Sequence, residues 1–375
     1  MAAAFSDIKT LVVKIGTTLL TGNHGFERAV IEDVVKDIAK LKRERGMNVI
    51  IVSSGAMGCG MDRLGMSTRP SSLPEKQATA AVGQSRLMHV YEELLDAHGG
   101  GLHAAQVLLS ARDLDDRRGY LNVRNTLNAL FDFGNVIPII NENDSTATEE
   151  IRVGDNDTLS AMVASKINAD LLIILSNVDG LYDKDPSTDP SARLVDRVEA
   201  VTAETEALAS GTRAATSIGG MKTKLSAARI ACVTGTPMVI ANGRRPNAVS
   251  EILAGTCPMT YFGASLNAMP HRKRWIAFGR SPRGAVIVDD GAREALLGKG
   301  RSLLPAGVVA VEGAFELGEA VNVKDSTGRE IARGLSNYAS REVEVIKGHK
   351  STEVERLLGY RDFDEVIHRD NLVIL

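Results

Sequence analysis

Short apolar runs alternate with longer amphipathic segments along the first two thirds of the chain. The apolar runs predict strands at residues 11–15, 49–52, 104–109, 136–140, 171–175 and 238–241. Segments with an apolar stripe at helical spacing predict helices at residues 27–45, 76–98, 120–131, 158–167, 223–234 and 247–254. Continuously apolar strands are typical of strands covered on both faces. We therefore predict an α/β domain in which helices sandwich a mostly parallel sheet.

The pattern changes after about residue 262. Short β-type runs follow at residues 285–288, 308–312, 320–323 and 343–346, with turn residues between them, as at 325–328. This predicts a small, mostly β domain. The expected boundaries are 1–265 for the α/β domain, 266–281 for a linker and 282–375 for the β domain. The linker contains a short basic stretch at residues 271–274, which is typical of a solvated connection.

Composition fits a soluble globular protein of two domains, with 375 residues, 44% of them hydrophobic and 24% charged. The net charge of −3 and the absence of charge blocks give no sign of a nucleic-acid or membrane partner. No apolar run approaches the ~18 residues of a membrane span, and no signal core precedes the first strand. We expect a cytoplasmic protein. The three cysteines lack metal spacing, so we predict buried free thiols and no metal site.

Polar residues follow four of the predicted strands. Lys14 ends the first, Ser53-Ser54-Gly55 follows the second, residues 141–144 follow a later one, and Ser176-Asn177 follow another. In sheets of this kind ligands bind beyond the carboxyl ends of the strands, so we expect one site there. Each feature alone also fits ordinary structure, such as a lysine facing water, a serine-capped turn or an Asx-turn.

Two lysines stand in glycine-marked turns, Lys14 before Gly16 and Lys224 in the segment 218–224 that opens a helix. Backbone N–H groups and an ammonium group in such turns suit an anion, and phosphoryl transfer requires that charge be neutralised. The acidic cluster 154–157 lies between them in the chain, and Asp157 also suits a helix N-cap. A plain glycine-rich loop is the alternative for residues 218–224. Neither common nucleotide signature, G-x-x-x-x-G-K-[ST] or G-x-G-x-x-G, occurs.

Taken in order, several motifs resemble those of glutamate 5-kinases, members of the amino acid kinase superfamily. They are VVKIGTTLL, SSGAMGCG, NENDS, GDNDTLSA, DGLYDKDP and IGGMKTKLSAA. GRSLLPAGV, VEGAFELGEAV and IARGLSNYAS resemble the PUA domain that follows the kinase in many of these proteins. The resemblance spans nearly the whole chain. It implies the amino acid kinase fold and phosphorylation of the γ-carboxylate of L-glutamate by ATP with Mg²⁺, the first step of proline biosynthesis.

The resemblance also implies residue roles. Lys14 and Lys224 would act on the transferring phosphoryl group, with Asp157 between them as the organiser of both. The expected glutamate-binding residues are Ser54, Asp144, Asn156, Asn141 and Asp155. The expected ATP-binding residues are Lys14, Ser176, Asn177, Ile218, Gly219, Gly220, Met221, Lys222, Thr223 and Lys224. The family often has Thr-Asp where this chain has Ser176-Asn177. A homo-oligomer, dimer or tetramer, inhibited by proline is also implied.

The chemistry agrees with the lack of an evident catalytic histidine or cysteine. A γ-carboxylate has a reference pKa of about 4.3 and is ionised at neutral pH, so it needs no general base. The barrier is repulsion from polyanionic ATP, which lysines, Mg²⁺ and helix N-termini offset.

Two alternatives remain at this stage. The first is a kinase of another small amino acid carboxylate. The second is RNA binding, because PUA domains often bind RNA. An RNA footprint is basic, whereas residues 282–375 hold 13 Lys/Arg and 16 Asp/Glu, a net charge of −3 that does not support it.

Overall fold

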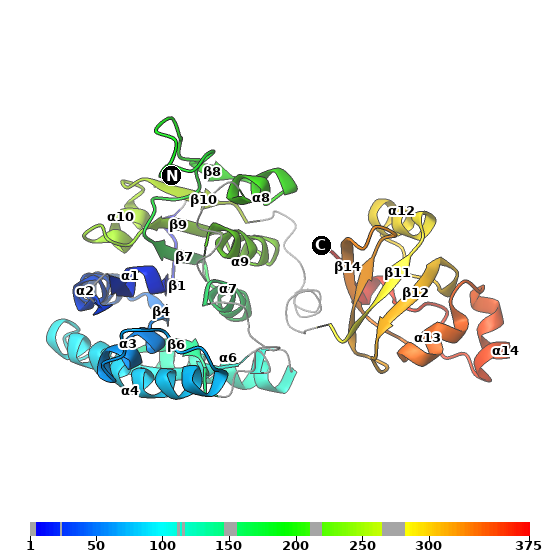
Figure 1. Cartoon of the computed structure of the whole chain (residues 1–375), viewed down its shortest axis with the longest axis horizontal. Helices are drawn as coiled ribbons and strands as arrows, with labels where there is room; N and C mark the ends of the chain where they lie inside the picture. The colour runs from blue at the N-terminus through cyan, green and yellow to red at the C-terminus, as the bar shows by residue number, and fades with distance from the viewer. Residues whose placement is uncertain are drawn as a thin grey trace. The chain divides into compact units, whose positions relative to one another are not determined.

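The computed structural model describes residues 5–22, 25–110, 113–114, 117–145, 156–210, 220–264 and 282–375 (Figure 1). The chain divides into two compact units, Met1–Ala268 and Met269–Leu375. The predicted linker at 266–281, with its basic stretch, lies outside the described residues. None of the helices in the described part combines the length and apolar character needed to cross a bilayer.

An eight-stranded sheet forms the centre of the first unit, in the order β5-β6-β4-β1-β7-β9-β10-β8. All neighbouring strands are parallel except β9 and β10. The strands are β1 (Thr10–Ile15), β4 (Asn48–Ser53), β5 (His103–Leu109), β6 (Val136–Glu142), β7 (Leu171–Ser176), β8 (Arg197–Val198), β9 (Met238–Asn242) and β10 (Met259–Phe262). A two-stranded ribbon of β2 (Thr21–Gly22) and β3 (Gly25–Phe26) stands apart from this sheet. The predicted mostly parallel sheet is confirmed.

Helices cover both faces of this sheet. Figure 1 shows α2 and α10 on one face and α7 and α9 on the other. The helices are α1 (Thr17–Leu20), α2 (Arg28–Arg45), α3 (Ala56–Arg63), α4 (Leu73–His98), α6 (Arg117–Asp132), α7 (Asn156–Ile167), α8 (Ala203–Ser210), α9 (Met221–Val233) and α10 (Ala248–Ala254). The six helices predicted from the sequence are present, with ends shifted by up to three residues. The short helices α1, α3 and α8 were not predicted.

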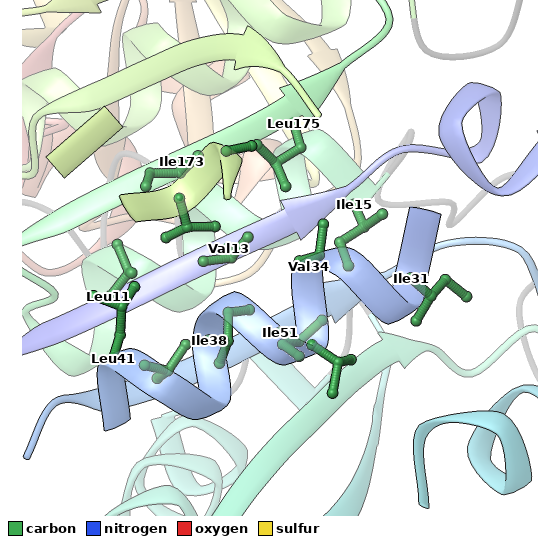
Figure 2. Close-up of a cluster of buried hydrophobic side chains, with 14 of the residues drawn as sticks. Leu11, Val13, Ile15, Ile31, Val34, Ile38, Leu41, Ile51, Ile173 and Leu175 are labelled. Carbon is green, nitrogen blue, oxygen red and sulfur yellow. The ribbon is translucent and has the colours of Figure 1, made fainter. Parts of the chain in front are cut away.

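The core on the α2 side shows how β1 presents its side chains. Figure 2 shows the alternate β1 residues Leu11, Val13 and Ile15 packed against neighbouring strands and against α2. Their neighbours are Ile51 on β4, Ile173 and Leu175 on β7, and Ile31, Val34, Ile38 and Leu41 on α2. Successive side chains of a strand point to opposite faces. Lys14 therefore points to the other face, toward α7 and α9. All three cysteines are buried and free, as predicted.

Helices α3 and α4 cross at two glycines. A Cβ atom on Gly60 would lie 1.9 Å from the Thr79 carbonyl oxygen, and one on Gly83 would lie 1.7 Å from the Ala56 carbonyl oxygen. Both distances are far below van der Waals contact, so only glycine fits at either position. The contact at Gly83 holds the middle of α4 against the start of α3, directly after the loop that ends β4.

The second unit contains a five-stranded sheet in the order β12-β11-β13-β14-β15. Its strands are β11 (Gly284–Val288), β12 (Val308–Gly313), β13 (Ala320–Lys324), β14 (Glu330–Leu335) and β15 (Leu372–Ile374). Within residues 282–375, three α-helices accompany them, α12 (Asp290–Lys299), α13 (Ser340–Ile346) and α14 (Val354–Leu358). The expected β-rich domain is confirmed.

One predicted strand of this unit is wrong, because residues 343–346 form the end of α13. Val343 and Ile346 are buried while Val345 is 47% exposed, which is helical spacing rather than strand alternation. The Glu342 carboxylate accepts the Ala339 backbone N–H at 2.8 Å and so satisfies a free donor at the helix start. Three β-branched residues in the four positions 343–346 favour a strand locally. The hydrogen bond from the Ala339 N–H to Glu342 favours the helix instead.

Candidate active site

Polar residues at the ends of parallel strands lie at one edge of the large sheet. The ends of β1 and β4 are in contact, because the Ser54 backbone N–H donates to the Ile15 carbonyl oxygen at 3.2 Å. Helix α7 begins at the same edge, where the Asn156 side chain donates to the Ser53 carbonyl oxygen at 3.2 Å. The strand ends therefore surround the start of α7.

Asp157 lies between the two predicted lysines. Its Oδ1 is 2.5 Å from Lys14 Nζ on β1, and its Oδ2 is 3.2 Å from Lys224 Nζ on α9. The Thr223 hydroxyl lies 2.9 Å from Oδ2 and also 2.8 Å from the Gly220 carbonyl oxygen, so its single proton serves one of them at a time. We refer to Lys14, Asp157 and Lys224 as the charge cluster.

Electrostatics keep the carboxyl group of the charge cluster ionised. The Asp157 side chain is fully buried, and those of Lys14 and Lys224 are only 5% and 7% exposed. Burial by itself raises the pKa of Asp157, but the two lysine charges and the hydrogen bonds outweigh it and hold this pKa below its usual value. Two ammonium groups thus share one carboxylate. Two ammonium groups this close together suit an anion at the sheet edge.

The start of α9 adds to this positive charge. Gly220 is its N-cap and makes no side-chain capping bond, and the first turn holds Lys222 and Lys224 with no acidic residue. Lysines in a first turn oppose the helix dipole and weaken a helix, whereas an anionic ligand there is favoured. This composition favours anion binding over a plain glycine-rich loop. Ile218 and Gly219 lie outside the described residues.

A chain of amide side chains adjoins the charge cluster. Asn156 Nδ2 donates to Ser54 Oγ and to Asn141 Oδ1, both at 3.0 Å. Asn141 Nδ2 donates in turn to Gln84 Oε1 at 2.7 Å. We call Asn156, Asn141 and Gln84 the amide chain. The structure thus brings together three of the residues expected to bind glutamate, namely Asn156, Asn141 and Ser54. It adds Gln84, which the sequence did not indicate, because a single glutamine in a predicted helix is not a recognisable signal.

Helix α4 holds the loop after β4 in place. Tyr91 is fully buried, and its hydroxyl lies 2.8 Å from Ser53 Oγ, which donates to the Ser54 carbonyl oxygen at 3.0 Å. Burial raises the pKa of Tyr91 and keeps its proton available for this bond. Gly55 has a φ of 101°, a conformation that side chains disfavour, and it turns the chain into α3. These contacts fix the position of Ser54.

The other predicted residues lie around this edge. Ser176 ends β7, the strand beside β1, and its hydroxyl donates to Asn177 Oδ1 at 3.4 Å. Asp144 lies in the turn after β6 and is partly buried, whereas Lys222 and Asn177 are exposed. Asp155 and the preceding residues 146–154 lie outside the described residues. Asp157 is the second residue of α7, so it is not the N-cap that its residue type also suited.

The described residues offer no preformed metal cage, since no group of three or more His, Cys, Asp or Glu side chains within them is arranged to hold an ion. Both oxygens of Asp157 already face ammonium groups.

Two family models match the chain. The amino acid kinase family matches residues 9–242, and the PUA domain matches residues 284–358. The first match covers every residue of the charge cluster and the amide chain.

Curated relatives match over nearly the full length. The glutamate 5-kinase of Pelobacter propionicus is 47% identical over 372 residues, 99% of each chain. That of Geobacter sulfurreducens is 48% identical over 371 residues, 99% of this chain and 98% of its own. That of Caldanaerobacter subterraneus is 48% identical over 366 residues, 97% of each. These matches confirm the resemblance found in the motifs.

Proposed function

Because the chain belongs to the amino acid kinase family, and within it to the glutamate 5-kinases, we propose that it transfers the γ-phosphoryl group of ATP to L-glutamate. A γ-carboxylate oxygen of glutamate forms a bond to the γ-phosphorus, and the bond from that phosphorus to the bridging oxygen of ADP breaks. The products are L-glutamyl 5-phosphate and ADP, and the reaction is the first step of proline biosynthesis. The charge cluster beside the amide chain is the observation that carries this proposal.

The two lysines of the charge cluster neutralise charge as the reaction proceeds. An anionic nucleophile must approach a polyanionic nucleotide, and preorganised cations in a site with little water reduce that repulsion most effectively. Lys14 and Lys224 come from different elements, β1 and α9, and their side chains are nearly buried. Both ammonium groups then contact the transferring group.

Asp157 positions these lysines and does not itself react. Its oxygens lie 2.5 and 3.2 Å from the two ammonium nitrogens, so a nucleophilic attack by Asp157 would disperse the charge that the reaction needs. A substrate carboxylate is already ionised at neutral pH and requires no base. The role left for Asp157 is to hold both ammonium groups at fixed separation before ATP binds.

We propose that Mg²⁺ enters with the nucleotide, as MgATP. Magnesium is usually held by substrate phosphates with one or two carboxylates, and a complete protein cage is not needed. When bound it supplies charge neutralisation at the phosphate oxygens. The exposed Lys222 in the first turn of α9 would meet the same phosphates at the positive end of the helix dipole.

The amide chain supports a free amino acid as the phosphoryl acceptor. Asn156 offers a neutral amide oxygen, Oδ1, that can accept a hydrogen bond from an α-ammonium group, which an acetylated amine could not satisfy. Buried polar groups left unpaired penalise the wrong substrate strongly. Glutamate is therefore favoured over N-acetylglutamate.

A coupled ADP-release assay with L-glutamate, L-aspartate and N-acetylglutamate tests this proposal. We expect MgATP-dependent turnover with glutamate and kcat/KM values at least about 100-fold lower for the other two acids, because a missing methylene or a blocked amine leaves polar groups unpaired. Comparable values for glutamate and N-acetylglutamate would contradict the assignment and favour a kinase of another small acid.

Several further features stay predictions. These are a homo-oligomer, inhibition by proline, RNA binding by the second unit, a cytoplasmic location, and the domain boundaries at residues 265 and 282. The negative charge of residues 282–375 remains the argument against RNA.

A further inference from the structure

The amide chain has a defined orientation, which one backbone group sets. The Glu142 backbone N–H donates to Asn141 Oδ1 at 2.9 Å, and a backbone N–H can only donate. Asn141 must therefore turn its Nδ2 toward Gln84, which presents Oε1 at 2.7 Å. On the other side, Asn156 must turn Nδ2 toward Asn141 and the Ser53 carbonyl oxygen. The oxygen and nitrogen of each amide are thus assigned by the hydrogen bonds rather than chosen freely.

This orientation leaves one unpaired atom at each end. Gln84 Nε2, a donor, and Asn156 Oδ1, an acceptor, are both buried and have no hydrogen-bond partner among the described residues. A buried polar atom without a partner costs free energy, and native proteins rarely keep one without a reason. Two such atoms of opposite kind at the ends of one chain indicate a ligand that offers an acceptor and a donor.

The main-chain end of a free amino acid offers that pair. Its α-carboxylate only accepts hydrogen bonds and its α-ammonium group only donates them. Resting on the proposed function, we propose that Gln84 is a specificity-determining residue whose Nε2 donates to the α-carboxylate of glutamate, while Asn156 Oδ1 accepts from the α-ammonium group. Asn156 directly precedes Asp157, and Gln84 is the member of the amide chain farthest along it from the charge cluster. The γ-carboxylate then lies at the charge cluster and the α end at the amides.

The backbone holds Gln84 in this position. The preceding residue, Gly83, lies against Ala56 with no room for a Cβ atom, and Ala56 directly follows the loop that carries Ser54. One turn beyond Gln84, Leu87 is fully buried, and Tyr91 reaches Ser53 from the same helix. The glutamine is therefore fixed on a rigid helix, as a selective contact requires.

Two substitutions and one altered ligand test this role. L-isoglutamine carries a carboxamide in place of the α-carboxylate and is added as a competitor of L-glutamate. In the unaltered protein, glutamate should bind more tightly than isoglutamine. In Gln84→Glu the new carboxylate repels the α-carboxylate and accepts from the carboxamide. The ratio of glutamate KM to the isoglutamine inhibition constant should then rise by about 10- to 100-fold, the range for a hydrogen bond to a charged group.

Gln84→Leu keeps a similar size and removes the donor. Its KM for glutamate should rise by about 10- to 100-fold while the KM for ATP stays unchanged. This variant decides the matter if Gln84→Glu does not fold, as judged by a thermal melt. An unchanged glutamate KM in Gln84→Leu would overturn the proposal. So would a ratio of glutamate KM to isoglutamine inhibition constant that stays the same in Gln84→Glu, because both ligands then lose affinity equally. Absence of glutamate phosphorylation by the unaltered protein would instead overturn the proposed function.

Discussion

Replacing Asp157 by asparagine removes one negative charge from between two ammonium groups and changes almost nothing else. At an effective dielectric constant of about 20, two unit charges at 4 Å attract by about 4 kcal/mol. Asp157 has two such partners and no exposed surface. Removing one member of a buried ion pair typically costs about 3–5 kcal/mol, because the remaining charge is left without a partner. We expect a loss of about 3 kcal/mol in the free energy of unfolding, since the lysines can turn toward the sheet edge.

The same change should also slow the reaction. Without Asp157 the lysines are no longer held at a fixed separation, so they bind ATP in the ground state without matching the transition state. We expect kcat to fall by about 10²- to 10³-fold, the usual loss for one electrostatic contributor. The melting temperature should fall by about 6–12 °C, at about 2–4 °C per kcal/mol for a domain of this size. MgATP should raise the melting temperature of Asp157→Asn by more than it raises that of the unaltered protein, because its phosphates replace the missing negative charge.

Asp37 offers a matched control on the opposite face of the sheet. It is also buried, and it accepts the Ser250 backbone N–H at 2.9 Å and the Ser250 hydroxyl. Asp37→Asn should lower the melting temperature while kcat stays within about twofold, since surface and packing effects far from a site are small. Steady-state kinetics and thermal melts on both variants separate stability from catalysis. Full kcat in Asp157→Asn would refute the positioning role.

The pH dependence of this stability difference follows from the direction of the pKa shift. The Asp157 pKa is below its usual value in the folded protein, so the carboxylate stabilises the fold above the unfolded pKa of about 3.9. This contribution is lost as the pH falls through the folded pKa. The melting difference between the unaltered protein and Asp157→Asn should stay constant from about pH 7 to 5 and shrink only below about pH 4. A difference that disappears near pH 6 would contradict the assignment of the shift.

Four further variants test other parts of the account. Lys14→Ala and Lys224→Ala should each lower kcat by about 10²- to 10³-fold with a folded protein by circular dichroism, and a raised KM with normal kcat would assign that lysine to ground-state binding. Gly83→Ala should raise the glutamate KM and lower the melting temperature, because its Cβ would lie 1.7 Å from the Ala56 carbonyl oxygen. Unchanged values would contradict the close crossing of α3 and α4. The fragment 1–280 should keep measurable kinase activity, because the described site residues precede residue 225, and a folded but inactive fragment would show that the second unit contributes to the site.

Strand and helix patterns in the first unit could be predicted because both faces of the sheet are buried. Buried strands such as β1 and β7 contain uninterrupted apolar runs, at residues 11–13 and 171–175, and the amphipathic stripe of α2 matches its packing against them. The helices that were missed are short or lack a stripe. In the second unit, α13 was missed because its β-branched residues favour a strand locally, and a backbone contact from Glu342 decides otherwise.

The site could be predicted only in part. Lysines at a strand end and in a helix-opening turn indicate anion chemistry, and the order of the motifs indicates the family. Gln84 gives no such signal, because its role depends on the close contact of Gly83 with Ala56 and on the orientation that Glu142 gives to Asn141. Contacts of this kind depend on atoms far apart in the sequence. They become visible only when the strand ends and α4 are placed together.

Oxygen-isotope transfer tests the central claim most directly. Glutamate labelled with ¹⁸O in its γ-carboxylate is incubated with MgATP, the protein and hydroxylamine. If the γ-carboxylate attacks phosphorus, hydroxylamine attacks the carbonyl carbon of the acyl phosphate and releases phosphate that carries one ¹⁸O atom. Mass spectrometry of the phosphate should show that atom in amounts equal to the ADP formed, and Asp157→Asn should lower both together. Glutamate-dependent ADP release with unlabelled phosphate would mean that water is the acceptor and would contradict the account.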